Sequence, residues 1–388
     1  MQTKTMIQLT TASAVAITRL LSTQNVYAEE VSSEATTIFE LTKPTTIQTS
    51  EGITITGATH LERWLKYRML QGDQNIHLAD YYVLAGEAYN GTQFYRDYDK
   101  AMQQPELQGI FPEDSYIQDQ EKSYDGYPIF TPQYYYDAET LKANLKAMRT
   151  FVTHEAKRVK TYKTEAGRVK AAYDIARNFK IHPYQKGISE KIAPDRQSYL
   201  FTLRTGEITG RSGVATLVYL VMKEAGIDAH LSLNKIDEYT YPYYDDIRVV
   251  INNKDYYVNP SRAVSAKNDA NIWGGYLLMS EMDHVTMTGL GNDIDGDPKK
   301  LRSKLEFYNK KKQILDGDII PALSKYLIKH NALTKGSHQY VFRVDNHVVF
   351  AQNLTPTKLK RQLAKRYPKM KNIRIQLDPN YMKVSYKI

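Results

Sequence analysis

The net positive charge of this sequence is concentrated in a segment near its C-terminus. Residues 299–388 contain 21 Lys and Arg and 5 Asp and Glu, a formal charge of 21 − 5 = +16, so the other 298 residues carry +9 − 16 = −7. Such a field attracts polyanions, including wall teichoic acid, anionic lipid, heparan sulfate and nucleic acid. The alternative is a surface that only keeps the chain soluble. The candidate cations that share one expected helix are Lys358, Lys360, Arg361, Lys365 and Arg366.

We expect the partner to be an anionic cell-wall polymer or a host protein or glycan. Nucleic acid is not expected, because no recognisable nucleic-acid-binding motif accompanies the charge.

A second group of ionisable residues is acidic. Asp293, Asp295 and Asp297 alternate, and carboxylates in such a row can surround a calcium ion. However, the glycine of this stretch is the fourth residue of the loop instead of the sixth, and Lys304 stands where a bidentate Glu is needed. A solvated acidic turn is therefore the preferred interpretation. No pair of histidines has the helical spacing of metal ligands, so we expect no metal and no cofactor.

The sequence has no cysteine, which excludes disulfides, thiolate zinc sites and cysteine nucleophiles. This composition fits proteins exported by Gram-positive bacteria. Residues 1–28 favour the same destination, because Lys4 gives a positive start, residues 6–17 are mostly apolar or small, and Ala28 ends a stretch typical of a signal-peptide cleavage site. The alternative is a disordered tail. No later stretch approaches the ~20 apolar residues that span a bilayer, so we expect a secreted protein that associates with the bacterial surface non-covalently.

The chain after residue 28 divides into four predicted parts. Residues 29–57 are rich in Thr, Ser and Glu and predict a linker with one short strand at 52–56. Residues 58–136 form a Tyr-rich region in which the clearest element is a helix at 60–70. Residues 137–298 and 320–388 are predicted to be two further domains.

Three amphipathic helices are predicted in the domain at 137–298. Asp137 caps the first, and the second follows Thr164. The third ends at Gly226, because glycine enters the left-handed C-terminal conformation without steric cost. Strands follow at 229–233, 247–251 and 256–258, with a turn at 252–253. A helix followed by antiparallel strands predicts an α+β core. The apolar stripe of the third helix consists of Val214, Leu217, Val218, Val221, Met222 and Ala225.

The domain at 320–388 is predicted to be a small basic β-β-α-β-β module. It begins with a helix at 320–330 that leads into the first strand. Thr355 and Pro356 mark the start of its internal helix, as cap and first residue. The predicted strands, in two hairpins, are 340–344 with 348–352 and 373–377 with 382–386.

Residues 171–263 resemble the core of the transglutaminase-like superfamily, which has a papain-like fold. In that family a long helix begins at Gly-x-Cys-x-Gly-Tyr-Ala and ends in Ala-Gly-Ile. A His-Ala-Trp strand and a strand ending in Val-Asp-Pro-Thr come later. The matching stretches here, in the family's order, are Tyr173-Asp174-Ile175, Thr209-Gly210-Arg211-Ser212-Gly213-Val214-Ala215, Glu224-Ala225-Gly226-Ile227-Asp228-Ala229 and Asn252-Asn253-Lys254-Asp255-Tyr256-Tyr257-Val258-Asn259-Pro260-Ser261. The resemblance implies a helix packed on an antiparallel sheet.

The resemblance also implies that the catalytic positions have changed. The family's Cys, His and Asp correspond to Arg211, Tyr244 and Asn259. A guanidinium cannot attack a carbonyl, a phenol is not a base near neutral pH, and an amide carries no charge to orient an imidazole. We therefore expect a pseudoenzyme that acts by binding, in adhesion or virulence. A third possibility is an adhesin whose cleft is empty.

Two hypotheses give the vestigial cleft a task. Arg211 beside a helix N-terminus would form an anion pocket for a carboxylate-bearing peptide or glycan, and the resemblance implies that Tyr241, Tyr243, Tyr244 and Asn259 converge on it. The alternative for Arg211 is a structural salt bridge.

The competing hypothesis is an atypical acyltransferase or hydrolase in which Ser212 is the nucleophile and His230 its base. Against it, Ser212 can act as a helix cap and His230 as a half-buried strand residue.

Overall fold

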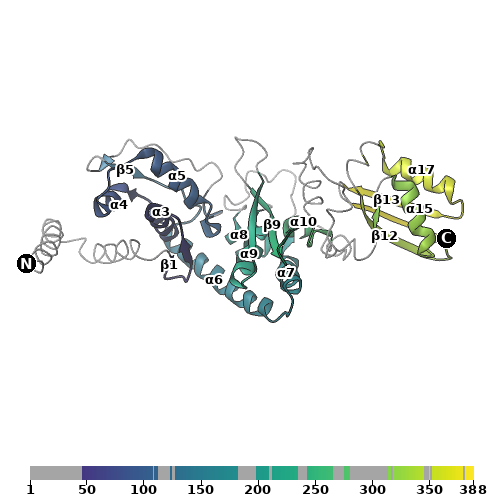
Figure 1. Ribbon diagram of the computed structural model, residues 1–388, viewed down its shortest axis with the longest axis horizontal. Helices are drawn as coiled ribbons and strands as arrows, with labels where there is room; N and C mark the ends of the chain where they lie inside the picture. The colour runs from purple at the N-terminus through teal and green to yellow at the C-terminus, as the bar shows by residue number, and fades with distance from the viewer. Residues whose placement is uncertain are drawn as a thin grey trace, which may run out of the picture. The chain divides into compact units, whose positions relative to one another are not determined.

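The computed structural model describes residues 46–107, 109–111, 123–124, 127–181, 198–208, 212–234, 243–264, 275–279, 313–315, 318–344, 349, 352–378 and 381–388. These residues build a mixed α+β protein with several small sheets (Figure 1). They fall into two compact units, the first within 1–107 and 114–142 and the second within 108–113 and 143–388. The expected α+β class is confirmed at this level. The predicted signal peptide at 1–28 lies outside the described residues.

The first unit begins with a hairpin of β1 (Thr46–Gln48) and β2 (Thr54–Thr56). Residues 46–57 of the predicted linker thus belong to a folded element, and its isoleucines are the reason. Ile47, Ile53 and Ile55 are buried, and the first and last of them are cross-strand partners. Burying each such side chain contributes about 1.5–3 kcal/mol.

Helix α3 (His60–Gln71) follows, one residue longer than predicted, and it carries a buried charged side. Thr59 caps it by accepting from the Glu62 backbone N–H. Glu62 and Lys66 form an ion pair at 2.6 Å, and the Lys66 ammonium also donates to the Thr56 carbonyl at 2.6 Å. Buried charges persist when they are paired in this way, so these bonds hold α3 against the hairpin.

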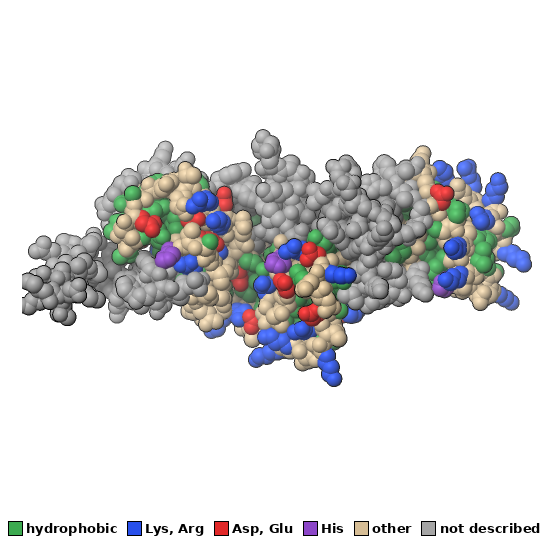
Figure 2. Space-filling view, in the orientation of Figure 1, with side chains coloured by type: hydrophobic (Ala, Val, Ile, Leu, Met, Phe, Trp, Pro, Cys, Tyr) green, Lys and Arg blue, Asp and Glu red, His purple; other side chains and the backbone are tan. Residues whose placement is uncertain are grey.

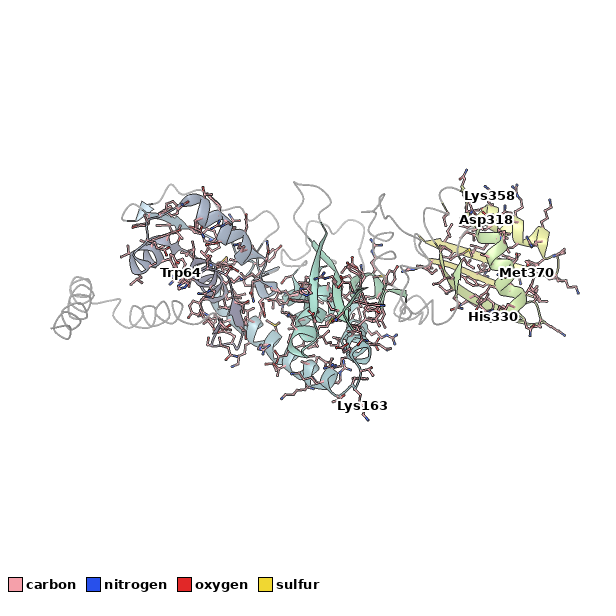
Figure 3. The ribbon with its side chains drawn as sticks, viewed as in Figure 1. Trp64, Lys163, Asp318, His330, Lys358 and Met370 are labelled. Atoms are coloured by element: carbon pink, nitrogen blue, oxygen red, sulfur yellow. The ribbon has the colours of Figure 1, made fainter. Side chains whose placement is uncertain are left out.

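The remainder of this unit is an aromatic core. Its elements are β3 (Ile76–His77), α4 (Leu78–Ala85), α5 (Gly91–Met102), η1 (Pro105–Leu107), β4 (Ser123–Tyr124) and β5 (Tyr127–Phe130). Trp64, labelled in Figure 3, is fully buried. Its ring lies 5.5 Å from that of Tyr81. Tyr82 in turn stacks on Tyr127 at 6.1 Å. Much of the tyrosine in this region therefore serves packing, because each ring buries a large apolar body.

The second unit starts along α6 (Ala138–Lys160), whose predicted apolar stripe is buried. Asp137 caps this helix, as predicted, by accepting from the Thr140 backbone N–H at 2.7 Å. The elements that follow are α7 (Glu165–Tyr173), η2 (Asp174–Asn178), β6 (Lys180–Ile181), α8 (Tyr199–Thr205) and β7 (Glu207–Ile208).

At the centre of this unit, α9 (Ser212–Glu224) packs on a three-stranded antiparallel sheet in the order β10-β9-β8. The strands are β8 (Ala229–Asn234), β9 (Tyr243–Ile251) and β10 (Lys254–Val258), and α10 (Pro260–Val264) follows them. Gly226 has a φ of 75° after α9, and Asn252 and Asn253 have φ of 50° and 58° between β9 and β10. The predicted helix stop, turn and antiparallel strands are therefore confirmed.

The C-terminal module contains a four-stranded sheet in the order β11-β12-β14-β13. β11 is parallel to β12, and the other neighbours are antiparallel. Its elements are β11 (Ile314–Leu315), α15 (Ile319–Lys329), β12 (Ser337–Val344), α17 (Pro356–Arg366), β13 (Lys371–Asp378) and β14 (Tyr381–Lys387). Both predicted helices and the second predicted hairpin are confirmed.

The predicted β-β-α-β-β order is wrong in its first hairpin. Among the described residues, none between β12 and α17 forms a strand, and Gln352 and Asn353 form a turn. Asn353 has a left-handed φ of 47°, and the Leu354 N–H donates to the Val349 carbonyl at 3.0 Å. β14 pairs along one edge of β12, and on the other edge β11 pairs with Arg343 and Val344, at the end of β12 where the predicted hairpin has to begin. The fourth strand comes instead from upstream of α15.

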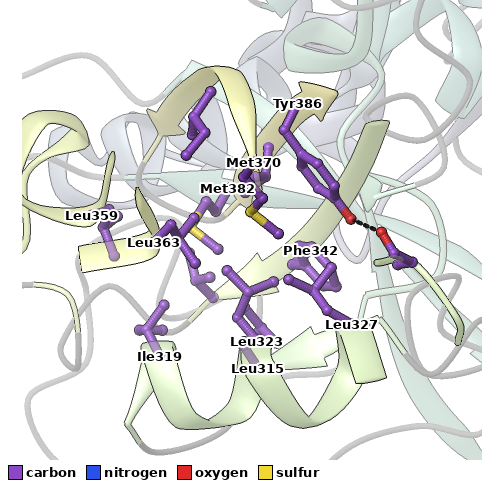
Figure 4. Packing of buried hydrophobic residues seen from close by; sticks show 14 of the residues in the cluster. Leu315, Ile319, Leu323, Leu327, Phe342, Leu359, Leu363, Met370, Met382 and Tyr386 are labelled. Carbon is purple, nitrogen blue, oxygen red and sulfur yellow. Dashed lines mark hydrogen bonds between the residues drawn. The ribbon is translucent and has the colours of Figure 1, made fainter. Parts of the chain in front are cut away.

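Both helices of the module pack on one side of this sheet through an apolar core (Figure 4). Leu323 and Leu327 of α15 and Leu359 and Leu363 of α17 are fully buried there, together with Phe342. The core is complete within residues 315–388. The exposed side of α17 is therefore held in a fixed position relative to the sheet.

Tyr386 adds a polar anchor to this core. Its hydroxyl donates to the Ala332 carbonyl at 2.6 Å (Figure 4). Burial raises the pKa of the Tyr386 phenol well above its usual value, so the group stays protonated and remains a donor.

Candidate functional site

The positions of the predicted vestigial pocket come together at one end of the α9 layer. α9 turns directly into β8, β8 is antiparallel to β9, and β9 is antiparallel to β10. This path brings the start of α9, the start of β9 and the end of β10 to the same end. The backbone positions of Ser212, Tyr244 and Asn259 therefore share that end. Extending the register of the last two strands places Asn259 opposite Asp246, two positions from Tyr244.

Asn259 has a structural task at this end. It is buried, its side-chain Oδ1 accepts from the Arg262 backbone N–H at 2.8 Å, and its own N–H donates to the Tyr276 carbonyl at 2.9 Å. The side chain thus caps α10. Arg211 and Tyr241 lie outside the described residues, as do the side chains of Ser212, Tyr243 and Tyr244.

Gly213, part of the motif that resembles the family's nucleophile region, is explained by packing. A Cβ at this position would lie 2.7 Å from the Thr202 Oγ1 and 3.2 Å from the Ser198 carbonyl oxygen. Such distances exclude a side chain unless α8 moves. The start of α9 is therefore pressed against α8, and this glycine alone does not indicate a reaction.

His230 lies away from Ser212. It follows the turn after α9 and so lies at the C-terminal end of that helix, whereas Ser212 is its first residue. The helix has 13 residues, and a rise of about 1.5 Å from each to the next separates its ends by about 18 Å. The core side of the sheet carries Ala229 and its register partner Val249, both buried. His230 points to the opposite, exposed side, where its Nε2 lies 3.0 Å from the Asp228 carboxylate. The geometry does not join it to Ser212.

The acidic candidate Asp293, Asp295 and Asp297 lies outside the described residues. Within the described ranges there is no group of three or more His, Cys, Asp or Glu side chains that could hold a metal ion. Of the helices that the structure describes, none combines the length and the apolar character needed to cross a membrane.

The cationic candidates lie together on α17. Thr355 caps the helix by accepting from the Lys358 backbone N–H, and Pro356 occupies its first turn. Leu359 and Leu363, four residues apart, face the core. Four other predicted candidates are exposed, and we call them the α17 cations: Lys360, Arg361, Lys365 and Arg366. The helix contains no Asp or Glu to neutralise them.

Lys358, the fifth candidate, has a different role. Its ammonium donates to the carbonyls of Gln352 and Asn353 at 3.0 and 3.2 Å. The Gln352 amide in turn donates to the Asp318 carboxylate at 2.8 Å. Lys358 therefore holds the turn before α17 to the start of α15, and most of its hydrogen-bonding capacity is used there.

The module carries further cations that were not among the predicted site residues. Lys and Arg side chains are spread widely over its visible surface (Figure 2). The strands β13 and β14 carry a group that we call the sheet cations: Lys371, Arg374, Lys383 and Lys387. The signal that identifies them is the alternation of charged and apolar residues along β14, which has the period of a strand.

Comparison with protein-family models and with curated proteins found no match to this chain.

Proposed function

We propose that the chain is a secreted, non-catalytic relative of the transglutaminase-like enzymes that acts by binding, and that its C-terminal module holds an anionic polymer of the bacterial cell wall. The observation that carries this proposal is the surface of α17. It presents four exposed cations and no acid on a helix that two buried leucines fix to the sheet. A positive surface of this kind concentrates polyanions by long-range attraction.

The ligand is recognised by charge and not by stacking. α17 contains no aromatic residue, whereas proteins that bind single-stranded nucleic acids add aromatic platforms to their basic grooves. Each exposed ion pair contributes little alone. Affinity for a polymer comes from neutralising several charges at once and releasing their counterions. A polymer of sugar or polyol phosphates satisfies these requirements.

Three observations support binding without catalysis. The sequence has no cysteine, so the family's usual nucleophile is absent. The Asn259 side-chain oxygen is occupied in capping α10. His230 lies on the side of its sheet that faces away from α9.

The test is equilibrium binding of the full chain to soluble poly(glycerol phosphate). The variant replaces all four α17 cations by Glu. A matched control makes the same change of charge along α6 and the turn after it, at Lys146, Lys157, Lys160 and Lys163, which are also exposed. We expect at least a hundredfold weaker binding for the α17 variant and a much smaller loss for the control. Equal losses would show that only net charge matters, and an unchanged α17 variant would refute the site.

Catalysis is tested separately with transamidase and amidase substrates. We expect no turnover by the wild type or by Ser212→Ala. Turnover by the wild type that disappears in the variant would establish the enzyme hypothesis instead. Arg211→Ala tests the anion-pocket hypothesis, which is removed if the variant binds every carboxylate ligand as the wild type does.

A further inference from the structure

The sheet of the C-terminal module has a second side that neither α15 nor α17 covers. In β14 the side chains of Met382, Val384 and Tyr386 enter the core beneath α15 and α17. Successive side chains of a strand point to opposite sides, so Lys383, Ser385 and Lys387 belong to the other side. We call this other side the free face.

The register of the neighbouring strands extends the free face into rows. Lys387 pairs with Lys371 of β13 and with Ser337 of β12, so two cations share the first row. The next row along the strands contains Arg374, Ser385 and Gln339, and the one after it contains Gln376, Lys383 and Val341. Every one of these rows thus carries at least one of the sheet cations.

The sheet cations form a stripe that runs along the strands. Lys371, Arg374 and Lys387 are exposed, and Lys383 is half-buried. From Lys387 to Lys383 the stripe extends four residues, about 14 Å at about 3.4 Å per residue. A polymer bound along this stripe lies parallel to the strands and does not wrap around the edge of β13.

The free face also lacks a stacking platform. Tyr381 is the one aromatic residue that the described register assigns to it, and this side chain is buried. At the same end of the sheet Val341 and Arg343 are buried as well, so the accessible part of the free face is the part that carries the exposed cations. Its chemistry is that of α17: fixed positive charge without aromatic rings.

These two cationic surfaces lie on opposite sides of one rigid core. α17 covers the core side of the sheet and exposes its cations away from it, while the sheet cations occupy the free face. A helix is about 10 Å across, and the sheet lies beyond it, so one extended segment of polymer cannot touch both surfaces.

We propose that the C-terminal module binds two segments of anionic polymer at once, one on α17 and one on the free face, and thereby cross-links the chains of a flexible phosphate polymer. This inference rests on the proposed function and adds a second site and a physical task to it. A protein with two separated sites joins polymer chains into networks when neither partner is in large excess.

The test mixes the full chain with long poly(glycerol phosphate) over a range of molar ratios and records light scattering. We expect scattering to pass through a maximum and to fall when either partner is in excess. Two charge variants remove one surface each: the α17 variant described above, and Lys371→Glu/Arg374→Glu/Lys387→Glu on the free face. Each is expected to abolish the scattering maximum, and the free-face variant is expected to bind a short oligomer within about tenfold of its wild-type affinity because its α17 surface is intact.

Further arms separate the alternatives. Lys→Gln and Arg→Gln versions of both variants, with circular dichroism and thermal melting, show whether any loss reflects unfolding. If the free-face variant scatters like the wild type, the second site is refuted. If the wild type binds long polymer as a one-to-one complex without networks, cross-linking is refuted while the proposed function stands. If the wild type binds no polymer, the proposed function itself fails, and tighter binding to single-stranded DNA of equal charge would overturn the choice of ligand.

Discussion

The helices α9 and α17 are both amphipathic, with the same helical period. They differ in what surrounds them: α9 is largely buried in its layer, whereas α17 presents cations to solvent. In α9 the apolar positions are buried almost without exception, and the family's catalytic position falls just before its first residue. In α17 only Leu359 and Leu363 are fully buried, and the remaining surface is cationic. The difference teaches that α9 serves the packing of its layer, whereas α17 holds exposed charge in place with only two fully buried side chains.

The largest expected loss of stability comes from opening a cavity beneath each helix. Leu217→Ala in α9 and Leu363→Ala in α17 both truncate fully buried side chains, and each is expected to lower the free energy of unfolding by about 2–5 kcal/mol. Chemical denaturation measures this loss. Only Leu363→Ala should also weaken polymer binding under native conditions, because it loosens the support of the α17 cations. Equal binding by both variants would break the comparison.

Gly213→Ala tests the close approach of α9 and α8. The added methyl meets the Thr202 hydroxyl and the Ser198 carbonyl, so we expect a loss of about 1–3 kcal/mol in thermal or chemical unfolding. Gly91→Ala at the start of α5 is the matched control, because the nearest atom to its new methyl is 3.4 Å away. That control should be neutral or stabilising by up to about 1 kcal/mol. A neutral Gly213→Ala would contradict the packing explanation.

Thr355→Ala removes the cap of α17. The lost hydrogen bond to the Lys358 N–H should cost about 1 kcal/mol, seen as a lower unfolding midpoint. Thr355→Ser keeps the oxygen and should behave as the wild type. A serine variant as unstable as the alanine variant would show that the methyl group, not the cap, matters.

The smallest effect concerns the cap of α6. The hydrogen bond from the Thr140 N–H lowers the pKa of Asp137 below its usual value. A group whose pKa is lowered by folding contributes stability above its unfolded pKa and loses it as the pH falls through the folded pKa. Asp137→Ala should therefore be less stable than the wild type near pH 6, and the difference should shrink in acid. Denaturation curves at several pH values check this, and a difference that grows in acid would contradict it.

The elements that were predicted correctly are those whose signals are local. Gly226 ends α9, Asn252 and Asn253 form the turn, and Thr355 caps α17, each through the conformational preference of its own residue type. The antiparallel strands on either side of the asparagine turn are neighbours in sequence, so their pairing followed from the turn.

The features that escaped prediction depend on distant parts of the chain. β11 has two residues and pairs in parallel with a strand beyond α15, so neither its length nor its partner is visible locally. Residues 348–352 have the composition of a strand, but β11 already pairs with β12 at Arg343 and Val344, next to the predicted turn. The orientation of His230 and the use of Lys358 in a turn were likewise set by packing and register.

The salt dependence of binding tests the central claim most directly. With four α17 cations neutralising phosphates, affinity of the full chain for a short phosphate polymer should fall about 50-fold between about 50 and 200 mM salt, and the α17 variant should show a much flatter dependence. Affinity that stays constant over this range, or a variant whose slope matches the wild type, would contradict binding through these charges.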